Sequence, residues 1–203
     1  MKLSVIIPVY NQEDLVIRAL ANLPERDDIE ILVRDDGSTD HTLENVKRYA
    51  AEHPGKNIKV FANGENKGVA YTKNQLLKDA KGEYIHIHDS DDYVQTDEYG
   101  KVIDLLGGAD IYCFNLRVND GAIYYLNEAT QSLYCAQIAR FIRREFAEGL
   151  QFPEDIKAGD DGYFAVDIMK RNPNIVYTGI TAYNYNYPRV GSLTDLRIRG
   201  ILP

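Results

Sequence analysis

The first half of the chain contains four short apolar runs, separated by longer and more polar segments. The runs cover residues 3–10, 29–33, 58–61 and 83–88 and are rich in β-branched residues. A near-continuous apolar run suits a strand covered on both faces, as in a parallel sheet. Helical spacing follows the first three runs, and strands that alternate with helices in this way indicate right-handed crossovers. We therefore expect an α/β fold with a mostly parallel central sheet flanked by helices.

The second half of the chain is less regular. Apolar spacing there predicts helices at residues 101–106, 134–148 and 161–170, and strands at residues 109–114, 123–126 and 175–177. The chain shows no linker, repeat or low-complexity stretch, so we interpret residues 1–203 as a single domain. Its first half is expected to bind a ligand and its second half to shape a pocket.

Three carboxylates stand within four residues at the end of the fourth apolar run, where residues 89–92 read DSDD. Carboxylates packed this closely raise one another's pKa unless a positive charge lies among them. Divalent cations prefer oxygen ligands, and ligands of open α/β sheets bind at the C-terminal ends of strands. The run thus indicates a metal at the rim of an active site. An acidic turn that caps the next helix remains the alternative.

The overall charge and composition limit the classes of partner. The net charge of −8 disfavours nucleic acid and anionic membranes, so an anionic substrate would need a metal or a few well-placed basic residues. No apolar run is long enough to span a membrane, and Met1 leads directly into a strand, without a signal peptide. Cys113 and Cys135 lack the spacing of a metal site and are expected to be reduced thiols.

Two further acidic pairs lie at the ends of expected elements, at residues 35–36 and 160–161. Each alone is weak evidence, because turns and helix caps often place aspartate at strand ends. Together with residues 89–92 and with polar residues at 10–11 and 66–68, they indicate one acidic cleft along the edge of the sheet.

The chain resembles the family 2 inverting glycosyltransferases of the GT-A fold in an ordered series of motifs over nearly its whole length. The motifs are SVIIPVYN at 4–11, DDGSTDHT at 35–42, NKG at 66–68 with Asn74 after it, GEYI at 82–85 before DSDD at 89–92, GDD at 159–161 and GSLT at 191–194. The resemblance implies a Rossmann-like, mostly parallel central sheet. It also implies a nucleotide-sugar-binding half, residues 1–93, and an acceptor-side half, residues 94–203.

The resemblance implies roles in donor binding for several residues. Pro8, Val9 and Tyr10 would line the nucleobase pocket, and Asp36 would accept a hydrogen bond from the uracil ring. The remaining residues expected to approach the donor are Asn66, Gly68, Lys73 and Asp91.

The resemblance also implies the metal and the base. Asp89, Asp91 and Asp92 would hold Mn²⁺ or Mg²⁺, which would neutralise the charge that develops on a diphosphate leaving group. Asp161 would be the general base that takes the proton of the acceptor hydroxyl. No Ser-His or Cys-His constellation in the sequence argues for a covalent route.

The implied activity is transfer of a hexosyl or hexosaminyl group from a UDP-sugar to a saccharide or lipid-linked acceptor, with inversion, as in polysaccharide biosynthesis. The resemblance implies a cytoplasmic location, including the inner face of the membrane, and leaves open a peripheral association with it. Two positions depart from the family pattern: Asp160 stands where glutamate is usual, and Lys73 where arginine is common. Lysine keeps the charge but loses the bidentate geometry for phosphate.

Other functions are weighed against this one. His86 and His88 share a strand face and could form a zinc site with Asp91, as in a metal-dependent hydrolase, although the spacing matches no known hydrolase motif. A nucleotidyltransferase would need a glycine-rich phosphate loop, and residues 8–14 contain no glycine. A non-catalytic nucleotide-sugar-binding relative is the main alternative, and the intact Asp91, Asp92 and Asp161 argue against it.

Two features of the second half allow more than one interpretation. Tyrosines alternate with asparagines at residues 183–187, which predicts a strand whose aromatic face either packs in the core or stacks on an acceptor sugar. Arg189 nearby could reach the diphosphate or form a surface ion pair. Arg140, Arg143 and Arg144 are expected on the solvated face of the helix at 134–148.

Overall fold

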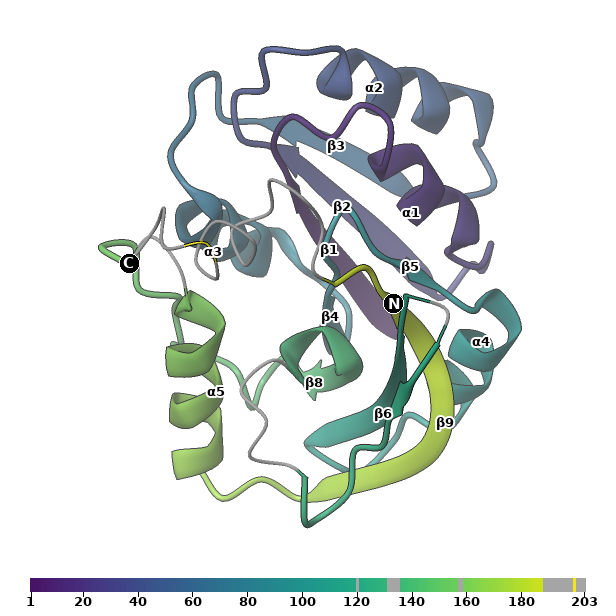
Figure 1. Ribbon diagram of the computed structural model, residues 1–203, viewed down its shortest axis with the longest axis vertical. Helices are drawn as coiled ribbons and strands as arrows, with labels where there is room; N and C mark the ends of the chain where they lie inside the picture. Colours follow the sequence, from purple (N-terminus) through teal and green to yellow (C-terminus); the bar gives the residue numbers. More distant parts are fainter. Residues whose placement is uncertain (120, 131–135, 157–158, 188–198, 200–203) are drawn as a thin grey trace.

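A computed structural model describes residues 1–119, 121–130, 136–156, 159–187 and 199, and Figure 1 shows their arrangement. The described strands form one nine-stranded sheet in the order β3-β2-β1-β4-β8-β6-β9-β5, with β7 paired to β6. The longest ladders are parallel, and helices flank the sheet. The α/β fold with a mostly parallel sheet, expected from the sequence, is confirmed.

The first half contains the parallel part of the sheet. Its strands are β1 (Leu3–Val9), β2 (Ile29–Asp35), β3 (Ile58–Ala62) and β4 (Tyr84–Ile87), and its helices are α1 (Val16–Asn22), α2 (Thr42–Glu52) and α3 (Val69–Asp79). The chain moves outward from β1 through β2 to β3 and then returns past both to β4. Because such crossovers are right-handed, α1 and α2 lie on one face and α3 on the other (Figure 1). The order of the strands changes direction at β1 and β4, and the ends of strands at such a switch point are the usual ligand position in these sheets.

Pro8 lies inside β1, although its missing N–H predicts that the regular strand ends there. In the parallel ladder Val9 O accepts the N–H of Asp36 on the β2 side, so the nitrogen of Pro8 faces the β4 side. On that side β4 has already ended, because its last paired residue, Ile87, lies opposite Ile6. Proline therefore costs the sheet no backbone hydrogen bond here, and β1 continues to Val9 beyond the last pair with β4.

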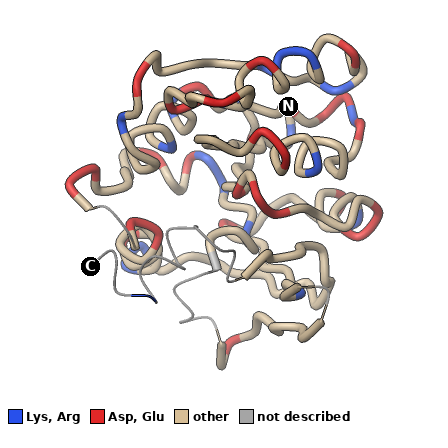
Figure 2. Tube along the Cα trace, turned by 45° about the horizontal axis from the view of Figure 1, so that its top comes forward, with Lys and Arg blue, Asp and Glu red and all other residues tan. Residues whose placement is uncertain are grey.

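The second half extends the same sheet with mixed strands. Its elements are β5 (Tyr93–Val94), α4 (Thr96–Asp104), β6 (Ile111–Val118), β7 (Ile123–Tyr124), a 3₁₀ helix at Ala136–Ala139, β8 (Arg140–Arg143), α5 (Asp160–Lys170) and β9 (Ile175–Tyr185). The long strand β9 curves from the far end of β6 back to β5 (Figure 1). Residues 172–187, which include β9, carry no charged side chain, and the lower part of the molecule is mostly uncharged in Figure 2.

The helix predicted for residues 134–148 is wrong. Residues 140–143 form β8, which fills the position between β4 and β6 and pairs with both in antiparallel orientation. Phe141 and Ile142 are both buried because this part of the sheet is covered on both faces, and such a strand cannot be told from a helix by periodicity. Arg140, expected on a solvated helix face, is therefore buried.

Candidate active site

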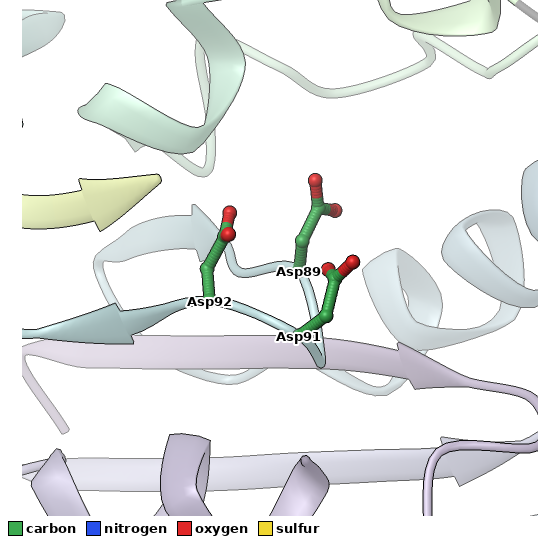
Figure 3. A group of neighbouring side chains, drawn as sticks. All are labelled: Asp89, Asp91 and Asp92. Carbon is green, nitrogen blue, oxygen red and sulfur yellow. The ribbon is translucent and has the colours of Figure 1, made fainter. Parts of the chain in front are cut away.

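The acidic loop between β4 and β5 brings three carboxylates together. One oxygen each from Asp89, Asp91 and Asp92 lies within 4.8 Å of the others. Figure 3 shows the three carboxylates on one side of the loop, with Asp92 beside the end of β9. Among the described residues this is the group of His, Cys, Asp and Glu side chains that could hold a metal ion. The sequence-based grouping of these residues thus agrees with their geometry.

The electrostatics of the loop favour a bound cation. Burial, with repulsion from Asp161 and Asp91, raises the pKa of Asp89 to about 7, although Lys73 opposes the shift. Burial and the charges of Asp89 and Asp91 also raise the pKa of Asp92 well above its ordinary value. A divalent cation would remove this repulsion, and carboxylate oxygens are its preferred ligands, so the three residues fit such an ion.

The predicted base pocket lies at the adjoining ends of β1 and β2. Val9 pairs with Asp35, and the N–H of Asp36 donates to Val9 O at 2.8 Å. Pro8 and Val9 are buried, whereas Tyr10 is 43% exposed and free of the core. Tyr10 and Asp36 therefore follow neighbouring strands at the same edge of the sheet, and their contact with a base stays a prediction.

The carboxylate of Asp36 holds the loop at residues 66–68. Its Oδ1 accepts hydrogen bonds from the N–H of Lys67 at 2.9 Å and the amide of Asn63 at 2.8 Å. Its Oδ2 accepts one from the N–H of Gly68 at 2.9 Å. Gly68 has φ +93°, a conformation that favours glycine, and α3 begins after it. The loop containing Asn66 and Gly68 is thus brought to the pocket.

Asp35 differs from its neighbour. Its Oδ2 accepts the N–H groups of Gly37 and Ser38 at 3.1 and 3.0 Å, which fixes the turn after β2. Its Oδ1 is buried and has no hydrogen-bond partner in the described structure. Asp35 is therefore a residue of the turn, and the resemblance gives the contact with the base to Asp36.

Lys73 joins the two halves of the chain at the acidic pair of α5. Its Nζ lies 2.9 Å from Asp160 Oδ2 and 2.6 Å from Asp161 Oδ1, and its side chain is 3% exposed. Burial would lower the pKa of Lys73, but attraction to Asp161, Asp160 and Asp89 raises it overall. The sequence predicts contact of Lys73 with the donor and does not predict its ion pairs with the acidic pair.

The two carboxylates of this pair differ in access. The side chain of Asp161 is 36% exposed and that of Asp160 only 6%. Burial raises the pKa of Asp160, and attraction to Lys73 offsets the shift only in part. Asp161 is therefore the member that an incoming hydroxyl can meet, in keeping with the role that the resemblance gives it.

His86 is not available as a zinc ligand. Its Nε2 donates to Ile138 O at 2.8 Å, so its Nδ1 accepts the hydroxyl proton of Tyr99 at 2.7 Å. Burial lowers the pKa of His86 well below its ordinary value, so the ring is neutral. His88 donates from Nδ1 to Asp89 O at 2.7 Å and so stabilises the start of the acidic loop. Because both ring nitrogens of His86 are hydrogen-bonded, His86 cannot join His88 and Asp91 in the zinc site that a hydrolase would need.

Sequence reasoning missed several polar contacts to the acidic loop. Arg18 Nη2 donates to Asp91 O at 2.9 Å, and Tyr183 and the N–H of Asn186 donate to the carboxylate of Asp92. The alternation of tyrosine and asparagine predicted a strand there but not this hydrogen bonding. Tyr183 is fully buried, as the core interpretation expects, and Tyr185 is half-buried and stacks on Tyr187 with ring centroids 5.2 Å apart.

Some predicted features lie outside the described residues: Arg189, the motif at 191–194 and Cys135. Cys113 is a buried free cysteine, as expected. No helix in the described part of the chain is long and apolar enough to cross a membrane.

A mostly parallel sheet with an acidic, cation-fitting loop at the C-terminal end of a central strand is an arrangement typical of ligand-binding α/β proteins. The chain belongs to glycosyl transferase family 2, because the family model of that description matches residues 4–171. It shares 39% identity over 102 residues with "Poly(ribitol-phosphate) beta-glucosyltransferase" of Bacillus spizizenii, a match over 48% of this chain and 16% of that protein.

Two further relatives match over most of the chain. "Poly(ribitol-phosphate) beta-N-acetylglucosaminyltransferase TarS" of Staphylococcus aureus is 27% identical over 213 residues, which is 94% of this chain and 36% of that protein. The TarS 1-349 structure in complex with UDP-GlcNAc superposes with TM-score 0.79 at 26% identity, over 95% of this chain and 60% of that one. The mannosyltransferase PcManGT of Pyrobaculum calidifontis, at 23% identity and TM-score 0.74 over 94% of this chain and 58% of that one, has the same fold. The chain thus spans well under two thirds of the length of the poly(ribitol-phosphate) transferases.

Proposed function

We propose that the chain transfers a hexosyl or hexosaminyl group from a UDP-sugar to a saccharide or lipid-linked acceptor, with inversion at the sugar. The observation that carries the proposal is the acidic loop at residues 89–92, which Lys73 links electrostatically to Asp161 at the start of α5. The similarity to TarS, whose structure is described in complex with UDP-GlcNAc, supports a UDP-sugar as the donor.

The uridine would bind at the ends of β1 and β2. Tyr10 is exposed beside the backbone of Pro8 and Val9, where its ring can stack on a base. Asp36 Oδ2 accepts one hydrogen bond from the protein and keeps a second lone pair for a uracil N–H. The loop of Asn66 and Gly68, which Asp36 holds, would close over the ribose or the diphosphate.

The diphosphate would lie between this loop and the acidic cluster. Asp89, Asp91 and Asp92 would hold Mn²⁺ or Mg²⁺ there, and the ion would neutralise negative charge on the leaving group. The buried ammonium of Lys73 would attract the diphosphate, because its charge already acts on Asp89 as well as on the two carboxylates of α5. We therefore retain Lys73 among the donor-binding residues.

Asp161 would act as the general base. Its Oδ1 is held by Lys73 at 2.6 Å, which fixes the carboxylate at the start of α5 while the side chain stays 36% exposed. It would accept the proton of the acceptor hydroxyl as the new bond to the sugar C1 forms. The bond from C1 to the phosphate oxygen breaks in the same displacement, and the nucleoside diphosphate leaves with its electron pair. One such step inverts the configuration at C1.

The acceptor would enter from the second half of the chain. Residues 1–93 would form the donor side of the site, and residues 94–203, which include α5 and β9, would form the acceptor side within the same domain. The names of the poly(ribitol-phosphate) transferases support a polymeric acceptor. Assembly of such an acceptor on a lipid carrier would place the reaction in the cytoplasm, at the inner face of the membrane.

Product formation from UDP-GlcNAc and UDP-glucose, with poly(ribitol phosphate) as acceptor and Mn²⁺ present, tests the proposal. We expect release of UDP that depends on acceptor and is lost in Asp161→Asn. A protein that binds UDP-sugars but releases no UDP with any acceptor would instead be a non-catalytic nucleotide-sugar-binding relative.

A further inference from the structure

We propose that Tyr183 is a positioning residue for the metal-binding loop, because its hydroxyl ties the carboxylate of Asp92 to the backbone of Asp89. The inference rests on the proposed metal-assisted function. It concerns a residue of β9, some ninety positions from the acidic motif in sequence, to which none of the motifs assigns a role.

The hydrogen bonds of Tyr183 have a fixed direction. The N–H of Asp89 can only donate, so it donates to Tyr183 Oη, at 3.2 Å. The phenol proton is therefore free to donate to Asp92 Oδ2, at 2.9 Å. The other oxygen of Asp92, Oδ1, accepts the N–H of Asn186 at 2.8 Å. One hydroxyl thus bridges the first and last carboxylate-bearing residues of the loop.

This arrangement opposes the repulsion within the acidic cluster. Three carboxylates whose oxygens lie within 4.8 Å would separate if the loop were free to relax. Asp92 is 1% exposed and each of its oxygens has a neutral donor from the end of β9. Each oxygen retains a lone pair, so Asp92 can still face a cation while its position is fixed from behind.

The strand β9 reaches the loop because of an irregularity in its pairing with β6. The register shifts around Asn115, whose amide donates to Gly179 O at 2.8 Å, and Gly179 has φ +71°. A bulge of this kind bends a strand. The bent end then pairs with β5, where Tyr183 lies opposite Val94, two residues after Asp92.

The ring of Tyr183 has no room to turn away from the loop. It is fully buried, and its centroid lies 5.2 Å from that of His88 and 5.7 Å from that of His86. The hydroxyl is therefore preorganised before any ligand binds. Outer hydrogen bonds that orient metal ligands commonly change metal affinity by about 10–100-fold when removed.

The test compares Tyr183→Phe with Tyr99→Phe. Tyr99 is equally buried in the same aromatic cluster, and its hydroxyl donates to His86 at 2.7 Å without contact to an aspartate. Each variant removes one buried hydroxyl. Mn²⁺ affinity is measured by calorimetry and by the electron paramagnetic resonance signal of free Mn²⁺, with and without UDP. Thermal unfolding and UDP binding are measured in chelator.

We expect Tyr183→Phe to weaken Mn²⁺ binding about 10-fold or more and Tyr99→Phe to leave it within about 2-fold, with similar melting temperatures in chelator for both. Equal Mn²⁺ affinity in Tyr183→Phe and the parent would overturn the proposal while the metal site stands. A parent protein that binds no Mn²⁺ with UDP, yet transfers sugar in chelator, would overturn the metal site itself and the role of Tyr183 with it.

A measurement on the parent protein does not depend on the folding of a variant. The N–H of Asp89 lies in a loop, and its partner is the Tyr183 hydroxyl. Hydrogen exchange in chelator should show protection of this amide, comparable to that of neighbouring strand amides. Free exchange of the Asp89 amide in the folded, metal-free protein would contradict the preorganised bridge.

Discussion

At the scale of single residues, the site consists of carboxylates that are held in place by neutral hydrogen-bond donors or by the ammonium group of Lys73. Three N–H groups hold Asp36, a phenol and a backbone N–H hold Asp92, and, among the described residues, Lys73 forms the ion pairs with the two carboxylates of α5. Removal of one holding group should therefore affect ligand binding more than it affects the fold.

Asp161→Asn should lower sugar transfer by about 100-fold or more, in line with loss of a general base, and should change donor affinity only a few-fold. Asp160→Asn is the matched control, because it changes the neighbouring carboxylate, which is less exposed and shares the same lysine. Steady-state transfer rates check the ranking. A larger loss in Asp160→Asn would move the base to that residue.

Asp36→Ala should weaken UDP binding by about 1–3 kcal/mol, the loss expected for an unmet hydrogen bond to a charged group. Asn63→Ala serves as the control: it removes one side-chain hydrogen bond to Asp36 and leaves the carboxylate and its two contacts to the loop at 66–68 in place. Calorimetry of UDP should show a clearly smaller effect in Asn63→Ala. Equal losses would mean that the hydrogen bonding around Asp36, and not a bond from Asp36 to the base, determines UDP affinity.

The raised pKa of Asp89 predicts a pH dependence of stability in the absence of metal. The folded pKa of about 7 exceeds the ordinary value of 3.8, so within this window the folded state binds more protons than the unfolded state. The free energy of unfolding contributed by this group therefore falls as pH rises through the window. Asp92 and Asp160, whose pKa values are also raised, add to the same trend.

Thermal unfolding in chelator between about pH 4 and pH 7 measures this dependence. Asp89→Asn should flatten the decline, since it removes the titrating group, and Mn²⁺ should stabilise the parent most at the upper end. If the free energy of unfolding of the parent, relative to that of Asp89→Asn, rose with pH, the raised pKa assigned to Asp89 would be contradicted.

At the scale of elements, the site depends on two features that local periodicity does not reveal. The short strand β8 supplies the antiparallel partner that connects β4 to β6, and its sequence reads equally well as a helix. The bulge between β6 and β9 then turns the end of β9 toward β5. The first half, by contrast, follows its sequence closely because turn residues separate its apolar runs from the helical segments between them.

Glycine substitutions test the bend in β9. Gly179 has φ +71° with open space where a methyl group would lie, so Gly179→Ala should destabilise the fold by about 1 kcal/mol or more through backbone strain alone. Gly100 lies inside α4 with equally open space and an ordinary helical backbone, so Gly100→Ala should stabilise by about 0.5–1 kcal/mol. Chemical denaturation of both variants measures the difference. The same sign for both would argue against strain at Gly179.

At the scale of the whole molecule, the parallel half and the acidic loop could be predicted from sequence because both depend on local signals: apolar runs, turn residues and clustered carboxylates. The ion pairs of Lys73 with α5 and the bridge of Tyr183 to Asp92 could not, because each joins residues about ninety positions apart. Such contacts follow from how the second half folds back across the sheet, and apolar spacing predicted that half least well.

UDP binding measured by calorimetry, in parallel with Mn²⁺ and with chelator, tests the central claim of a metal-assisted nucleotide-sugar site most directly. We expect clear binding with Mn²⁺, little binding in chelator, and loss of the metal-dependent part in Asp92→Ala, whose fold should persist because the change also removes a buried charge that Asp89 and Asp91 repel. Equal affinity for UDP with Mn²⁺ and with chelator would contradict a metal that bridges Asp89, Asp91 and Asp92 to the diphosphate.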